Sequence, residues 1–275
     1  MFTWKRVLLT LLPAAVVGPW ALAGAARSEP PHTFVEEGLV ATESYEDYLG
    51  AAVAIDGDTL LAAPGWNDYV EVFVRDASGS WQQDYLQSYQ RLAAPDATTE
   101  ICTDPVYHVC HHDGFGMDLA ISGNTLVIGA PWNKVAGEDA GAAYVYVRDS
   151  TGLWVLDGRL DPPVPGPFNE FGVAVDIEGN RILVGARGAY DGAGAVYVYK
   201  HRRRAWRLVQ TIVGNGSDGL GADLALDGNR FLVSAAGRAF VFKRGRGGVW
   251  SQSAELDVGA LPQDAFQYLA LDGPR

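Results

Sequence analysis

Short apolar runs interrupted by glycine recur along the chain. One such stretch begins at Phe171 and reads FGVAVDIEGNRILVGARGAYDGAGAVYVYK. Glycine inside a helix costs about 1 kcal/mol relative to alanine, so this stretch does not fit a helix. Charged residues such as Asp176, Glu178, Arg181 and Arg187 exclude a membrane span. The pattern instead predicts short strands separated by tight turns.

The same pattern returns at intervals of about 45 to 65 residues. Further units begin with LGAAVAIDGD at Leu49, FGMDLAISGN at Phe115 and LGADLALDGN at Leu220, and a partial fifth unit begins at Phe266. Each complete unit continues with a second strand, a variable loop, an aromatic-rich third strand, a polar turn and a fourth strand. The fourth strands are led by tryptophan, at Trp81, Trp154, Trp206 and Trp250. Four-stranded units of this length are typical of β-propeller blades, so we predict an all-β propeller fold.

The third strands support blades that are covered on both faces. Residues 143–147 (AYVYV) and 196–199 (VYVY) are apolar at every position, whereas a strand with one wet face would alternate apolar and polar residues. Small residues at Gly129-Ala130, Gly172 and Gly185-Ala186 fit a close approach of backbones near a crowded axis.

These units resemble the FG-GAP repeat family, which is named after a Phe-Gly at the start of the unit and a Gly-Ala-Pro after its second strand. The second unit carries both motifs, as Phe115-Gly116 and Gly129-Ala130-Pro131. The other units match in part, and the resemblance is greatest to the bacterial secreted, integrin-α-like branch. Calcium loops of the integrin type are not seen in residues 65–69, 132–141, 187–194 or 235–237, which lack the required series of oxygen ligands. We therefore expect no cofactor.

The N-terminus resembles a secretory signal peptide over residues 1–26. Lys5 and Arg6 precede an apolar run that is too short for a spanning helix, and a segment rich in small residues follows. The alternative is a membrane anchor. Secretion to the bacterial periplasm or the extracellular space agrees with the cysteine pair Cys102 and Cys110, which we expect to form a local disulfide in an oxidising compartment. After removal of the signal peptide we expect no transmembrane segment.

The predicted domain organisation has three parts. Residues 27–47 follow the signal peptide and resemble the end of a unit, so we expect them to supply one outer blade strand. Residues 48–275 hold the repeats, at about 48–114, 115–170, 171–219 and 220–265, with a partial unit at 266–275. Three interpretations remain open: an incomplete or truncated propeller, a small propeller closed by its terminal strands, and an open array completed by another chain.

Two clusters are candidate sites. The ligand-type residues His108, His111, His112 and Asp113 are candidates for zinc or copper, but the oxidising compartment favours the alternative, a disulfide-pinned loop with exposed histidines. Two basic turns occupy the same place in consecutive units and form a candidate patch for an anionic ligand. Its residues are Lys200, Arg202, Arg203, Arg204, Lys243, Arg244 and Arg246. Solvated hairpin tips are the alternative.

Charge and motifs narrow the function classes. The formal net charge of −12 disfavours nucleic-acid binding. The sequence has no nucleophile elbow, zinc-protease motif or phosphate loop. We therefore predict a non-enzymatic interaction or adhesion module that presents loops to a protein or a polysaccharide. The alternatives are an assembly piece that self-associates through an open blade edge, and a glycan-active enzyme.

Overall fold

A computed structural model describes residues 49–64, 68–83, 91–96 and 112–256, together with Leu269 and Leu271. The signal peptide, the N-terminal segment, Cys102, Cys110, His108, His111 and nearly all of the partial fifth unit lie outside the described residues. The described chain is all-β, and no helix in it has the length and hydropathy to cross a bilayer.

The strands form four antiparallel sheets, one for each predicted unit, and we call these sheets blades. The first blade contains β1 (Leu49–Asp56), β2 (Thr59–Pro64), β3 (Tyr69–Arg75), β4 (Trp81–Gln83) and β5 (Arg91–Ala93). The second contains β6 (Leu119–Ser122), β7 (Thr125–Ala130), β8 (Ala142–Arg148) and β9 (Trp154–Leu160). The third contains β10 (Ala174–Glu178), β11 (Arg181–Ala186), β12 (Ala195–Arg202) and β13 (Ala205–Val213). The fourth contains β14 (Leu224–Asp227), β15 (Arg230–Ala235), β16 (Arg238–Arg244) and β17 (Trp250–Leu256).

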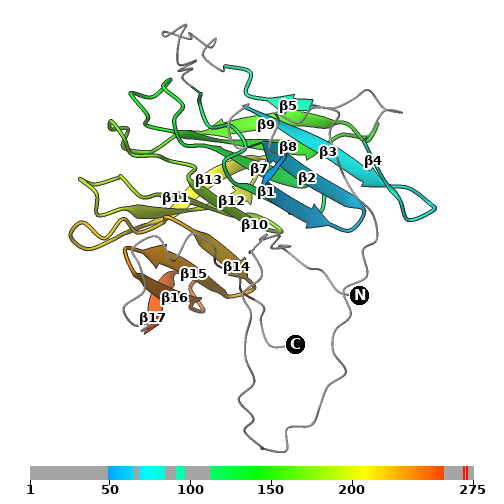
Figure 1. The fold of residues 1–275 in the computed structure, drawn as a ribbon. Helices are drawn as coiled ribbons and strands as arrows, with labels where there is room; N and C mark the ends of the chain where they lie inside the picture. Colours follow the sequence, from blue (N-terminus) through cyan, green and yellow to red (C-terminus); the bar gives the residue numbers. More distant parts are fainter. Residues whose placement is uncertain are drawn as a thin grey trace, which may run out of the picture.

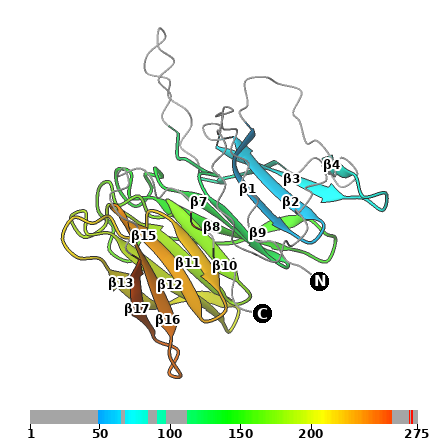
Figure 2. The same ribbon diagram turned by 60° about the horizontal axis from the view of Figure 1, so that its bottom comes forward.

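The blades follow one another in chain order, from the blue first blade to the orange fourth blade (Figures 1 and 2). In each of the last three blades, consecutive strands pair with their neighbours from first to fourth. The first strands of consecutive blades, β1, β6, β10 and β14, lie beside one another. This arrangement of four-stranded blades confirms the predicted propeller fold.

The first blade departs from this pattern at its outer edge. Both β4 and β5 pair with β3, with β4 opposite Phe73–Arg75 and β5 opposite Tyr69–Glu71. The position of the fourth strand is therefore shared by two short strands, between which the chain carries additional residues.

A tight turn joins the first two strands of each blade. In the third blade, Glu178 pairs with Arg181, so Gly179 and Asn180 form a two-residue turn. Gly179 has a φ of 57°, while Asn180 is not among the residues with positive φ. A type II′ turn favours glycine at its first central position and makes no such demand on the second. This explains why the four units share the glycine but not the residue that follows it.

Three apolar clusters fill the spaces between consecutive blades. In the space between the second and third blades, Phe171 packs against Tyr197 with ring centroids 5.3 Å apart. Residues 142–146 and 195–199 are buried throughout, as expected for third strands covered on both sides. The core is therefore divided among the joints between the blades.

Paired glycines bring the blades close together. A methyl group at Gly129 would lie 1.9 Å from the carbonyl oxygen of Gly172 in the next blade, and one at Gly185 would lie 2.1 Å from that of Gly221. The glycine of the Gly-Ala-Pro position thus meets the glycine of the next Phe-Gly position. The close approach predicted from the sequence is present, and it lies at the joints between blades.

Hydrogen bonds also connect consecutive blades beside the turns between their first and second strands. In each, a side chain of one blade accepts the N–H of the turn glycine in the next blade. Asp56 accepts the N–H of Gly123 at 2.6 Å, Ser122 accepts that of Gly179 at 3.0 Å, and Glu178 accepts that of Gly228 at 2.8 Å. Because each acceptor belongs to the preceding blade, these hydrogen bonds hold consecutive blades at a repeated offset. The blades therefore form a rigid scaffold that positions the loops and turns at both ends of the strands.

Candidate functional site

The loops between the second and third strands, and those between blades, form one continuous surface. We call residues 131–141, 161–173 and 187–194 the loop surface. Backbone hydrogen bonds join its segments: Phe168 N–H donates to Glu138 O at 2.8 Å, and Gly188 N–H donates to Asn169 O at 3.2 Å. Arg187 also forms an ion pair with Glu170. These bonds hold three loops from two blades in one arrangement.

Large apolar side chains project from the loop surface into solvent. Val135, Val164, Phe168 and Tyr190 are exposed, with Phe168 at 56% and Tyr190 at 41%. A methyl group at Gly188 would meet the carbonyl oxygen of Phe168, so Phe168 lies directly beside the loop that carries Tyr190. Exposed aromatic residues on rigid loops are common features of binding surfaces.

The backbone of the loop surface is locally strained. Among the described residues, eight that are not glycine have positive φ. Five of these lie on the loop surface: Asp139, Phe168, Glu170, Tyr190 and Asp191. Each left-handed residue of this kind costs of order 1–3 kcal/mol and persists only where its surroundings impose it. Both exposed aromatic residues are therefore held in conformations that their own sequence does not favour.

A buried polar network anchors the loop surface through Asn133. Asn133 donates to Asp113 at 3.0 Å and to the hydroxyl of Tyr144 at 3.2 Å, and that hydroxyl donates to Asp96 at 2.5 Å. Burial, reinforced by the hydrogen bond to Asp96, raises the pKa of Tyr144 well above its ordinary value. Arg159 pairs with Asp96 and carries the network across the joint between the first and second blades.

The structure describes two of the four candidate metal ligands. Asp113 is buried in the polar network, and the Nδ1 atom of His112 lies 3.4 Å from a carboxylate oxygen of Asp68. No group of three or more His, Cys, Asp and Glu side chains with metal-site geometry occurs among the described residues.

The basic residues lie at the opposite ends of the strands, on two hairpins. Lys200 and Arg202 end β12, and Arg203 and Arg204 form the turn to β13. Lys243 and Arg244 end β16, and Arg246 lies in the turn to β17. Arg244 covers the ring of Trp250, with its guanidinium 5.7 Å from the ring centroid, so it packs against its own blade. The others are exposed or partly exposed.

A groove of about 370 Å³ opens beside the first basic hairpin, between the second and third blades. Its polar and aromatic lining comes from Thr125, Asp157, Asn180, His201, Arg204 and Trp206. Arg204 was predicted from the sequence as part of the basic patch. The groove itself was not predicted, because its walls come from two different units.

Comparisons with known proteins agree with this architecture. The FG-GAP repeat family matches residues 110–146 and 154–199, which cover most of the second and third blades. No curated protein sequence matches the chain. Among solved structures, a protein from Lactobacillus plantarum has a TM-score of 0.51 at 14% identity, with 78% of this chain and 57% of that chain covered. A proposed 6-phosphogluconolactonase from Bacteroides fragilis has a TM-score of 0.50 at 14% identity, with 77% and 58% covered.

The chain spans less than two thirds of the length of these two structures. At 14% identity the likeness concerns the fold alone. The family match adds the repeat motifs that the joints use, since it includes both members of the glycine pair Gly129 and Gly172. Residues 110–146 and 154–199, which form most of the second and third blades, therefore carry FG-GAP repeats.

Proposed function

We propose that this protein is a non-enzymatic interaction module, and that the loop surface binds its protein or glycan partner. The observation that carries the proposal is the pair Phe168 and Tyr190, two exposed aromatic residues in left-handed backbone conformations on loops tied to each other. An aromatic anchor on a preorganised backbone contributes to binding with little loss of conformational entropy.

The surroundings of the two aromatic residues suit a selective contact. Asp139 and Glu170 are already paired with Lys134 and Arg187, and the further carboxylates Glu138 and Asp191 leave the loop surface with an excess of negative charge. A partner with an apolar centre and basic groups around it would match this pattern. FG-GAP repeats are typical of extracellular proteins, so we place this interaction outside the cell.

The test removes both aromatic side chains and keeps the backbone. Asparagine tolerates the left-handed conformation, so the double variant Phe168→Asn and Tyr190→Asn should fold normally. We expect binding of the labelled chain to intact bacterial cells, measured by flow cytometry, to fall at least tenfold. Val249→Asn is the matched control, because Val249 is 63% exposed but lies in the turn between β16 and β17, away from the loop surface. Equal binding by the double variant and the control would refute the proposal.

A second candidate function, assembly through the fourth blade, is supported by its outer face. Leu232 and Val241 are partly exposed there, whereas their equivalents in the second blade, Val127 and Val145, are fully buried by the third blade. Light scattering on a sizing column distinguishes the two candidates. A mass that rises with concentration, and that returns to the monomer value in Val241→Glu, would favour assembly.

A further inference from the structure

The groove between the second and third blades lies where two positions carry smaller side chains than their equivalents in a neighbouring blade. Gly158 of β9 lies opposite Val145, and Gln210 of β13 lies opposite the equivalent Val198, so the two residues occupy the same register position. The side chain of Gln210 crosses to the fourth blade, where it donates to the carbonyl of Trp250 at 2.7 Å and accepts the N–H of Trp250 at 2.8 Å. Gly158 has no side chain that could cross to Trp206, the equivalent of Trp250.

A second change enlarges the same space. In the second blade, the guanidinium carbon of Arg148 lies 4.7 Å from the ring centroid of Trp154. The same guanidinium donates to the hydroxyl of Thr59 in the first blade at 2.6 Å. His201 occupies the corresponding position in the third blade, since its N–H bonds to Asn180 as that of Arg148 bonds to Asn124. The shorter histidine packs against Trp206 with the two rings tilted by 48° and their centroids 5.0 Å apart.

These two changes leave groups available to a ligand. Trp206 is partly exposed, whereas Trp154 and Trp250 are each only 3% exposed. Thr125, the equivalent of Thr59, lines the groove. The indole nitrogen of Trp206 is buried, so the exposed part of this side chain consists of its other ring atoms. The groove thus combines an aromatic side chain with several polar groups.

The mouth of the groove carries a cation in a strained position. Arg203 and Arg204 form the two-residue turn between β12 and β13, with φ values of 51° and 65°. A turn of this kind favours Asn-Gly, because both residues must adopt the left-handed conformation. Two arginines at these positions therefore place charge beside the groove at the expense of local stability.

We propose that this groove binds one acidic sugar residue, a hexuronate unit of a polysaccharide. The volume of about 370 Å³ lies within the usual range of small-ligand sites. Arg204 pairs with the carboxylate, Asp157 and Asn180 bind hydroxyl groups, and Trp206 contacts the apolar face of the ring. The site lies at the opposite ends of the strands from the loop surface, so it is independent of the proposed function and can be tested separately.

The first experiment measures binding of an α-1,4-linked galacturonate trisaccharide to the purified chain by titration calorimetry. The methyl ester of the same trisaccharide is the neutral control. We expect the acid to bind with a Kd between about 10 µM and 1 mM, weakening as salt increases, and the ester to bind at least tenfold more weakly. Equal affinity for the acid and the ester, or no heat with either at millimolar concentration, would overturn the proposal. Tighter binding of tetraglutamate than of the acid would also overturn it, because the groove would then select charge and not a sugar.

The second experiment closes the groove in two ways. Gly158→Gln introduces the side chain that fills the next joint, and Gly158→Ala is its control, since a methyl group there meets no atom within 4 Å. His201→Arg restores the arginine of the neighbouring blades and adds a positive charge. We expect Gly158→Gln and His201→Arg each to reduce affinity for the acid at least tenfold, and Gly158→Ala to leave it unchanged. Stronger binding by His201→Arg would show that charge alone attracts the sugar, which would contradict a shaped site.

Discussion

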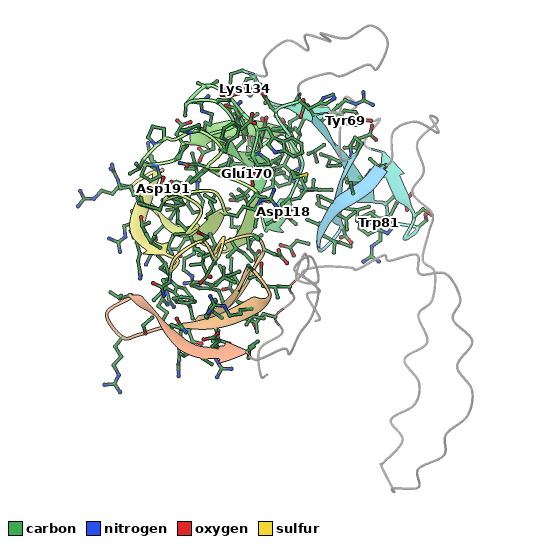
Figure 3. All side chains as sticks on the ribbon, turned by 60° about the vertical axis from the view of Figure 1, so that its left-hand side comes forward. Tyr69, Trp81, Asp118, Lys134, Glu170 and Asp191 are labelled. Carbon is green, nitrogen blue, oxygen red and sulfur yellow. The ribbon has the colours of Figure 1, made fainter. Side chains whose placement is uncertain are left out.

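The carboxylate of Asp118 joins two blades by accepting the N–H of Val175 at 2.7 Å. Its other oxygen accepts the N–H of the adjacent Leu119 at 2.9 Å. The first strand of a blade has an open edge, and such an edge leaves backbone N–H groups without partners. Asp118, which lies near the centre of the view in Figure 3, supplies an acceptor to both strands. Asp176 makes the same pair of bonds, to Leu226 and to its own neighbour.

Replacing Asp118 with alanine should therefore loosen the joint between the second and third blades. The variant leaves two backbone donors without this acceptor, and we expect the free energy of unfolding to fall by about 2–4 kcal/mol. Urea unfolding followed by far-UV circular dichroism measures the loss. Asp157→Ala is the control, because Asp157 is an exposed carboxylate and should change stability by less than about 0.5 kcal/mol. A loss in Asp118→Ala no larger than in the control would show that the bridge does not stabilise the joint.

The glycine pair at the same joint predicts a larger effect. In Gly129→Ala the new methyl group would lie 1.9 Å from the carbonyl oxygen of Gly172, so the two blades would have to move apart. We expect a loss of at least about 3 kcal/mol, or failure to fold. Gly158→Ala places the same methyl group in open space on a strand, and should be neutral or stabilising by up to about 1 kcal/mol. Similar melting temperatures for the two variants would contradict the close approach.

The sequence was sufficient to predict the blades, because each blade is specified locally. Turn glycines such as Gly179 mark the ends of paired strands, and apolar third strands mark sheets covered on both faces. The split outer strand of the first blade was not predicted, because β5 pairs with β3 from the far side of an insertion. Aligning the repeated units identifies equivalent residues, and in a propeller these residues occupy the same position in each blade.

The groove and the loop surface were harder to predict for a physical reason. The groove depends on Gly158 and His201. Neither residue belongs to a recognisable binding motif. Their effect is seen only by comparison with the larger residues at the equivalent positions, Gln210 and Arg148. Alignment of the units makes these positions equivalent, but only the structure shows that Gln210 bonds to Trp250 of the next blade and that Arg148 reaches Thr59 of the preceding one. The left-handed conformations of Phe168 and Tyr190 are imposed by neighbouring loops, and nothing in their own local sequence favours them.

Buried tyrosines predict a loss of stability at high pH. Burial, with a smaller contribution from the charge of Asp96, raises the pKa of Tyr146 to about 12. Burial also raises the pKa values of Tyr197 and Tyr199. Since the pKa of an unfolded tyrosine is about 10, the folded state retains protons that the unfolded state releases. The stabilisation is complete below about pH 10 and falls as the pH rises toward 12.

Tyr146→Phe isolates one of these contributions. We expect Tyr146 alone to account for about 1 kcal/mol of the stability lost between pH 8 and pH 11. The variant also loses the hydrogen bond from Tyr146 to the carbonyl of Ala93, so it should be less stable at pH 8 but show a shallower decline. Urea unfolding of both proteins at the two pH values gives the difference. Parallel declines would show that Tyr146 ionises equally in both states.

The turn formed by Arg203 and Arg204 predicts a variant that is more stable and binds less well. Replacing the pair with Asn-Gly supplies the residues that a turn with two left-handed positions favours. We expect the free energy of unfolding to rise by about 1–2 kcal/mol, because each arginine is released from an unfavourable conformation. The same change removes the cation that the proposed hexuronate site uses, so affinity for the galacturonate trisaccharide should fall at least tenfold.

Arg202→Gln separates charge from conformation in this experiment. Arg202 ends β12 and is exposed, and it is not among the residues with positive φ. We expect the substitution to change stability by less than about 0.5 kcal/mol and to weaken binding only slightly. A gain in stability for Asn-Gly together with a loss of binding would indicate that the arginines are kept for ligand recognition at the expense of stability. If the Asn-Gly variant were no more stable than the wild type, the strain assigned to this turn would be wrong, and only the charge of Arg204 would connect the turn to the groove.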